Sequence, residues 1–168
     1  MARIDLVSSP GEAERGRLEY RTADFSFLFT PASQSDYYWR LFELGGAILS
    51  VGTLELEVDV DSGVIRYADG YHPCTQWHAG SVSPGEYREG TVRVIDRQQL
   101  ISGVAWSVAP VGVWRTVYDR ISGWLRISSE ATDDDERVLI ASGTVLGLAD
   151  GTLNSVWLHP EFESPIVL

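Results

Sequence analysis

Lysine is absent from this chain, because all 13 of its basic residues are arginine. Chemistry that depends on a lysine amine is therefore excluded, including Schiff-base formation, phosphate binding by a P-loop lysine and general-base catalysis by lysine. A bias toward arginine codons in a GC-rich genome explains this composition more simply than selection against lysine. It indicates a bacterial source.

Cysteine is nearly absent as well, since Cys74 is the only one in 168 residues. No disulfide can form within the chain, which excludes an extracellular disulfide scaffold. The sequence also lacks any run approaching the roughly 18 apolar residues of a membrane span, and its first residues lack the apolar centre of a signal peptide. We therefore expect a cytoplasmic protein that has no membrane partner.

Positive charge is scarce. The 13 basic residues face 24 acidic ones, which gives a formal net charge of -11. Such a chain repels phosphate backbones, so we do not expect nucleic-acid binding. A strongly basic protein is its natural electrostatic complement, although net negative charge also simply keeps proteins in solution.

The length and the 44% hydrophobic content suit one domain with one core. Residues 8–17 are small, polar and rich in turn formers, so we expect residues 1–17 to be a flexible lead-in. The single domain is then expected to span residues 18–168.

Strand-like patterns dominate the chain. In residues 54–61 apolar and acidic residues alternate over eight positions, a period that indicates a strand, and residues 61–63 supply a turn that leads into a return strand at 64–67. Further strand-like segments occupy residues 19–30, 91–95, 101–108, 111–118, 122–127, 138–148 and 153–158. We therefore predict a mainly β fold, an antiparallel β-sandwich or β-barrel of about eight to ten short strands.

One segment leaves helix and strand open. Residues 33–43 begin with serines that suit a helix N-cap and end before Gly45 and Gly46, which suit a helix stop, yet their aromatic content suits a strand equally. The chain is expected to contain at most one or two short helices.

The acidic positions of the alternating segment form a candidate surface for a basic partner. Glu55, Glu57, Asp59 and Asp61 are spaced about 6.6 Å apart along one strand face. The same pattern is also typical of the solvated face of an outer strand. Aromatic residues anchor protein interfaces, and three tryptophans beside turns or in ambiguous segments are candidates for that role: Trp39, Trp77 and Trp114.

Residues 71–78 concentrate the rarer side chains. His72, Cys74 and His78 are residue types that bind zinc, so they form a candidate zinc site. Zinc is the one cofactor that the sequence suggests. Cys74 is also a candidate nucleophile, with a neighbouring histidine as its base. The alternative is an ordered loop in which Cys74 is buried as a small hydrophobic residue. The predicted rim of a ligand pocket comprises Tyr71, His72, Cys74, Trp77 and His78.

Three functions follow from these features. The first is a protein-binding domain, for example an antidote of the immunity-protein type that neutralises a basic toxin. The second is a β-barrel or sandwich that binds a small molecule or carbohydrate in an aromatic-lined cavity. The third is an enzyme of unidentified type with a His/Cys metal site. Because no catalytic motif is present, we expect a protein that is not an enzyme.

Overall fold

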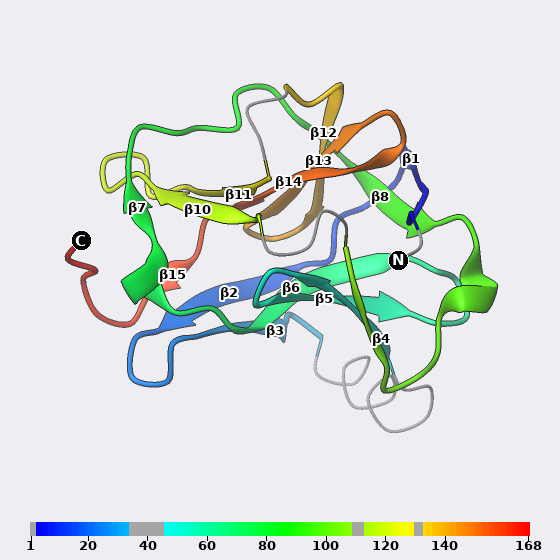
Figure 1. The fold of residues 1–168 in the computed structure, drawn as a ribbon, viewed down its shortest axis with the longest axis horizontal. Coiled ribbons are helices and arrows are strands. Elements are labelled where there is room, and N and C mark those ends of the chain that lie inside the picture. The colour runs from blue at the N-terminus through cyan, green and yellow to red at the C-terminus, as the bar shows by residue number, and fades with distance from the viewer. Residues whose placement is uncertain (1–2, 34–45, 109–112, 130–132) are drawn as a thin grey trace.

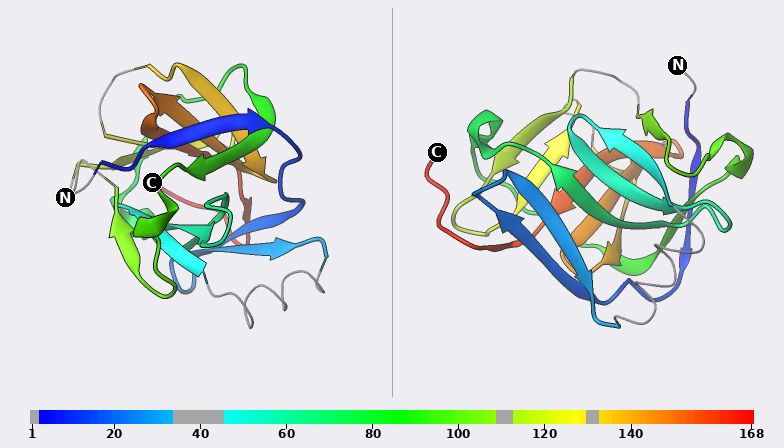
Figure 2. Two further views of the ribbon diagram at one scale, coloured as in Figure 1. Left: turned by 90° about the vertical axis from the view of Figure 1, so that its right-hand side faces the viewer. Right: turned by 90° about the horizontal axis from the view of Figure 1, so that it is seen from below.

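The computed structural model describes residues 3–33, 46–108, 113–129 and 133–168, and these residues form two β-sheets packed face to face (Figures 1 and 2). The prediction of a mainly β, sandwich-like fold is confirmed. Within the described ranges, no helix is both long enough and apolar enough to cross a bilayer.

The larger sheet has eight strands, and it forms the upper layer in Figure 1. In spatial order they are β1 (Leu6–Pro10), β8 (Arg88–Val94), β12 (Glu136–Ala141), β13 (Thr144–Ala149), β14 (Thr152–Leu158), β11 (Leu125–Ser128), β10 (Arg115–Tyr118) and β7 (His78–Ala79).

The second sheet has seven strands. In spatial order they are β15 (Glu161–Phe162), β2 (Gly16–Arg21), β3 (Ser26–Pro31), β6 (Ile65–Tyr71), β5 (Leu54–Asp59), β4 (Gly46–Val51) and β9 (Ala105–Ser107). Two single turns of 3-10 helix, η2 (Cys74–Gln76) and η3 (Arg97–Gln99), lie in the connections.

Strand number and direction differ from the prediction. The described residues form 15 strands rather than eight to ten, and four pairs are parallel: β7 with β10, β8 with β12, β2 with β15 and β4 with β9. Strands of two or three residues are too short to show a sequence period. Each parallel pair joins segments that are far apart in the chain, so no local turn signal announces it.

The predicted flexible lead-in, residues 1–17, contains strand β1 and the first two residues of β2. Strand β1 pairs with β8 from Leu6 opposite Val94 to Pro10 opposite Gly90, and the side chain of Leu6 is buried in the core. The backbone amide of Leu6 also donates to the carbonyl of Gly151. This strand is fixed by pairing with distant residues, which the polar local composition does not reveal.

Residues 19–30 form a hairpin rather than one strand. Strand β2 turns at residues 22–25 into β3, where Phe25 has a positive φ of 54°, and Tyr20 lies opposite Phe27. Both rings face the core. Of the ambiguous segment 33–43, all but Ser33 lies outside the described residues.

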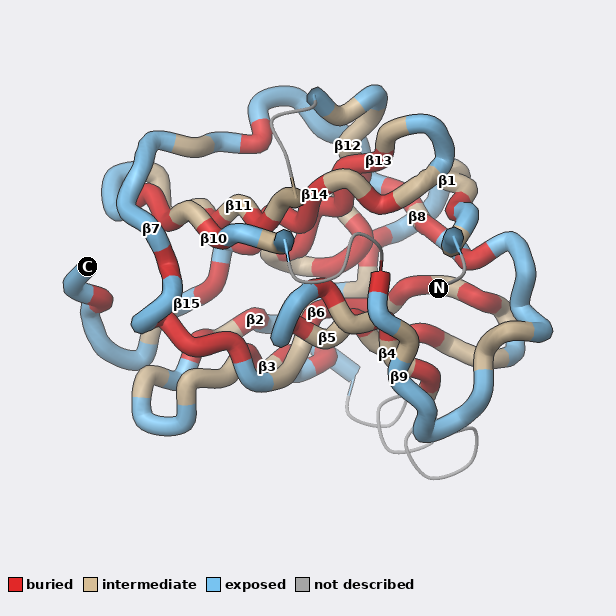
Figure 3. The backbone as a smooth tube through the Cα atoms, viewed as in Figure 1, coloured by how far each residue is buried: buried red, intermediate tan, exposed pale blue. Residues whose placement is uncertain are grey.

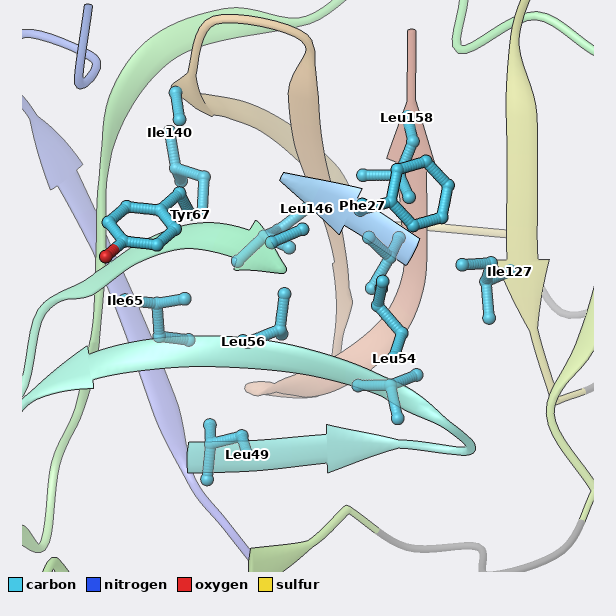
Figure 4. Packing of buried hydrophobic residues seen from close by; sticks show 14 of the residues in the cluster. Phe27, Leu49, Leu54, Leu56, Ile65, Tyr67, Ile127, Ile140, Leu146 and Leu158 are labelled. Atoms are coloured by element: carbon cyan, nitrogen blue, oxygen red, sulfur yellow. The ribbon is translucent and has the colours of Figure 1, made fainter. Parts of the chain in front are cut away.

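The alternating segment forms β5 as predicted. Leu54, Leu56 and Val58 are fully buried, whereas the acidic residues between them are only half-buried. In Figure 4, Leu49, Leu54 and Leu56 extend from the seven-stranded sheet toward Leu146 and Leu158 of the other sheet. In Figure 3 the buried residues lie mainly on the strands of both layers, and the exposed residues lie mainly on the loops that connect them.

Asp134, from the acidic segment 133–136, has a structural role. Its side chain is fully buried and accepts hydrogen bonds from Arg137, Asn154, Ser155 and Trp157. Burial opposes ionisation, but these donors outweigh it and lower the pKa of Asp134. The carboxylate therefore ties the start of β12 to β14, and β14 pairs with β11, the neighbour of β10.

Candidate functional site

A pocket of about 260 Å³ lies where the β4–β5 turn of one sheet meets the start of β10 in the other. We name it the His72 pocket. It collects three segments that are distant in sequence, and its ten lining residues are Gly52, Thr53, His72, Pro73, Gln76, Trp77, His78, Trp114, Arg115 and Thr116.

The β4–β5 turn brings Thr53 to the pocket. Gly52 has a φ of +62°, a left-handed conformation that glycine adopts without a steric penalty. A Cβ at Gly52 would also lie 3.5 Å from the Cβ of Trp114, so the β4–β5 turn of one sheet is in contact with the residue that precedes β10 of the other. The tight turn therefore sets Thr53 directly beside residues of β10.

A buried tyrosine fixes the loop that follows β6. The hydroxyl of Tyr20 donates to the carbonyl of His72 and accepts from the amide of Cys74, both at 2.9 Å. Tyr20 is fully buried, and burial raises the pKa of its hydroxyl. The neutral phenol thus satisfies two backbone groups on either side of Pro73 and fixes the direction of the His72 side chain.

His72 links the two sheets through hydrogen bonds. Its Nδ1 lies 2.7 Å from Oγ1 of Thr53, and its Nε2 lies 2.8 Å from Oγ1 of Thr116. Burial lowers the pKa of His72 to about 4, so the ring is neutral at pH 7. A neutral imidazole has one donor and one acceptor nitrogen, so the two threonines have opposite hydrogen-bonding roles toward it.

Aromatic rings support the pocket from the core side. Trp77 is buried, and its ring centroid lies 4.7 Å from that of Tyr20 and 5.8 Å from that of Tyr118. It also stacks on Phe27 at 6.1 Å. Trp114, on the other wall, donates its indole N–H to the carbonyl of Val108. The two indoles give the polar centre of the pocket rigid walls.

Three of the five predicted rim residues line the pocket, namely His72, Trp77 and His78. The other two do not: Tyr71 is exposed, and Cys74 is buried behind the loop as a small hydrophobic residue. Trp114 also lines the pocket, although the sequence predicts it as an anchor for a protein partner. Thr53 and Thr116 had no sequence signal, because they reach His72 only through the packing of the two sheets.

The candidate zinc ligands are not arranged around a common point. Within the described ranges, no three His, Cys, Asp or Glu side chains are grouped closely enough to hold a metal ion. Both nitrogens of His72 already have threonine partners. Zinc binding at His72, Cys74 and His78 stays a prediction.

The predicted partner residues are distributed over different environments. Asp59 forms an ion pair of 2.5 Å with Arg66, and the main-chain carbonyl of Asp61 accepts from Arg97. Trp77 is buried and Trp114 half-buried, while Trp39 lies outside the described residues. The described members of this set therefore differ in burial and in their partners.

Glu55 and Glu57 instead share a carboxylate cluster with a residue that sequence reasoning missed, Asp69. Glu55 lies directly opposite Asp69 across the β5–β6 pair. Burial, and then repulsion by Asp69 and Glu55, raises the pKa of Glu57 to about 7. Burial, together with repulsion by Glu55, raises the pKa of Asp69 to about 6, although a hydrogen bond from the Gly70 amide lowers it. We call Glu55, Glu57 and Asp69 the acidic cluster.

Comparisons with family models and with curated proteins give no relative. No protein-family model matches the chain, and no curated protein matches it in sequence. Neither comparison supplies a function for this chain.

Removing the Tyr20 hydroxyl should destabilise the loop that carries His72. Tyr20→Phe leaves the His72 carbonyl and the Cys74 amide buried without this partner, so we expect a loss of about 2 to 3 kcal/mol in the free energy of unfolding. Urea denaturation measures it. Tyr118→Phe is the matched control, because the Tyr118 side chain is also buried but its hydroxyl bonds no described residue. Equal losses in the two variants would contradict the role of Tyr20.

The acidic cluster should make stability depend on pH. Glu57 and Asp69 have folded-state pKa values of about 7 and about 6, above their ordinary values of 4.5 and 3.8, so the folded state holds their protons more tightly. Their protonation stabilises the fold as pH falls toward 4. His72 changes the free energy of unfolding in the opposite direction. Its pKa is lowered from 6.5 to about 4, so its contribution to stability is lost as pH falls from 6.5 to 4.

The double variant Glu57→Gln/Asp69→Asn separates these effects. It should be more stable than the wild type at pH 8 by on the order of 1 kcal/mol, and this difference should vanish near pH 4. Urea denaturation from pH 4 to pH 8 checks this. Glu86→Gln/Glu163→Gln removes the same charge at exposed positions away from the cluster and should leave the pH profile unchanged. Parallel profiles for wild type and double variant would refute the assignment.

Proposed function

We propose that this protein binds a small molecule with a single ring in the His72 pocket. The observation that carries the proposal is the hydrogen-bonded chain Thr53–His72–Thr116, which lies between two indole walls at the junction of the sheets. Ligand sites typically combine aromatic walls with a few convergent polar groups.

The size of the pocket supports a small ligand. The volume of about 260 Å³ is room for several water molecules. It lies just below the range of pockets that hold drug-sized molecules. One substituted ring therefore fits better than an extended chain.

Binding is favoured over catalysis by the state of His72. A general base is most effective when its pKa lies near the operating pH, and the pKa of His72 is lowered to about 4 by burial. Both ring nitrogens also have hydroxyl partners already. The lining residues include no cysteine, serine or carboxylate to serve as a stronger nucleophile.

Titration with simple ring compounds tests this function. Benzyl alcohol and methyl β-D-glucopyranoside, each at millimolar concentration, are the probes, and amide shifts of the lining residues are followed by NMR. At least one probe should shift the signals of His72, Thr116 and Trp114 together. Trp114→Ala should weaken that binding by tenfold or more, because a wall is lost, and Trp114→Phe should restore much of it.

Trp124→Ala is the matched control, since Trp124 is also half-buried but does not line the pocket. Binding to this variant should stay within about twofold of the wild type. If neither probe shifts any pocket signal, the proposed function is wrong.

A second candidate function is the binding of a basic protein partner at the acidic cluster. The raised pKa values of Glu57 and Asp69 favour it, because burial and repulsion among the carboxylates disfavour their charged forms, which a positively charged partner would stabilise. An arginine-rich surface would supply that charge, and the overall charge of -11 would speed the encounter. An antidote against a basic toxin is one protein of this kind.

A nona-arginine peptide is a suitable probe for this second function. Its affinity, measured by isothermal titration calorimetry, should fall by tenfold or more in Glu55→Gln/Glu57→Gln/Asp69→Asn. The variant Glu12→Gln/Glu86→Gln/Glu163→Gln removes three exposed charges elsewhere and should change it far less. Equal losses would mean that the peptide responds only to net charge and would overturn the proposal.

A further inference from the structure

The hydrogen-bond chain in the His72 pocket has a fixed polarity. The neutral imidazole donates from one nitrogen and accepts at the other, and a threonine hydroxyl is bonded to each. The threonine that accepts from the ring keeps its own hydroxyl hydrogen for another partner. The threonine that donates to the ring has only acceptor capacity left.

The pocket therefore offers one hydroxyl donor and one hydroxyl acceptor at a defined separation, spanned by the imidazole. Both threonines line the pocket. Thr53 is exposed, so its remaining capacity is open to a ligand, whereas Thr116 is buried at the inner end. A ligand that presents hydroxyl groups, each both donor and acceptor, complements such a pair whichever tautomer His72 adopts.

The walls select the remainder of the ligand. Trp114 has its N–H committed to Val108, so its contribution to the pocket is the apolar ring. Indole faces pack against the apolar C–H face of a ring. A ligand with one apolar face and several hydroxyl groups at its edge matches this arrangement.

The charge of the lining excludes a cation as the preferred ligand. None of the ten lining residues is acidic, in a chain with 24 Asp and Glu residues. The Thr53–His72–Thr116 chain carries no net charge at pH 7. Gln76 and Arg115 add hydrogen-bond donors to the lining of the pocket.

Resting on the proposed function, we infer that the ligand of the His72 pocket is a neutral pyranose sugar whose ring packs on indole and whose hydroxyl groups bond the Thr53–His72–Thr116 chain. Thr53 is the specificity-determining residue, because it is the exposed end of that chain.

The test uses the intact protein and three probes: methyl β-D-glucopyranoside, benzyl alcohol and methyl β-D-glucuronide. Tryptophan fluorescence gives affinities, and long-range ¹H–¹⁵N correlation spectra report the His72 ring nitrogens. The glucoside should bind at least tenfold more tightly than benzyl alcohol and shift a ring-nitrogen signal. Thr53→Val should remove most of this preference, and Thr53→Ser, which keeps the hydroxyl, should retain it.

The outcomes separate the two proposals. Pocket binding by benzyl alcohol with no preference for the glucoside overturns the sugar inference and leaves small-molecule binding intact. A glucuronide that binds tenfold more tightly than the glucoside overturns the neutral-ligand assignment and points to Arg115. If no probe changes any pocket signal, the proposed function fails as well. A Thr53→Val variant that keeps the full preference for the glucoside refutes the role of Thr53.

Discussion

The candidate site depends on one buried phenol. The Tyr20 hydroxyl satisfies the His72 carbonyl and the Cys74 amide at once, so the chain leaves β6 in a single direction. That direction sets the imidazole between Thr53 of one sheet and Thr116 of the other. Because unpaired backbone groups are costly in a core, the loop cannot leave this position without exposing the groups to water or burying them unpaired. The centroid of the Tyr20 ring lies 4.7 Å from that of Trp77. The position of the phenol therefore also determines the position of this pocket wall.

The His72 pocket differs from the aliphatic centre of the interface between the sheets. Most of the interface is made of aliphatic side chains such as Leu56 and Leu146, which hold the layers together through burial without directional contacts. At the pocket a polar chain crosses instead. A buried imidazole with both nitrogens bonded is more demanding than a leucine pair, since each bond must have correct length and direction. In return, the Thr53–His72–Thr116 chain places one hydrogen-bond donor and one acceptor at fixed positions, which apolar packing does not provide.

The sequence predicted the features with a local signal and missed those that arise from long-range packing. The alternation in residues 54–61 was enough to predict β5, its buried leucines and its acidic face. Residues 71–78, which carry the rarer side chains, contribute five of the ten lining residues of the pocket. By contrast, β1 lies in a polar segment and is fixed by pairing with β8, and Asp134 becomes a buried acceptor only because β14 brings Ser155 and Trp157 to it. Thr53, Thr116 and Asp69 belong to the same class, because nothing beside them in the chain indicates which partner the fold will supply.

The two candidate sites lie next to each other along the chain. Thr53 precedes β5 and lies two residues before Glu55, and His72 follows β6 and lies three residues after Asp69. The electrostatic character nevertheless changes abruptly there. Glu55 and Asp69 oppose each other on the half-buried face of the sheet, whereas the Gly52 turn and the Tyr20 contact direct Thr53 and His72 into the junction between the sheets. A change of backbone direction over two or three residues thus separates a cluster of carboxylates from a pocket lined without any. Because the acidic cluster can be neutralised while Thr53 and His72 are kept, and Thr53 can be changed while the carboxylates are kept, the two functions can be tested independently.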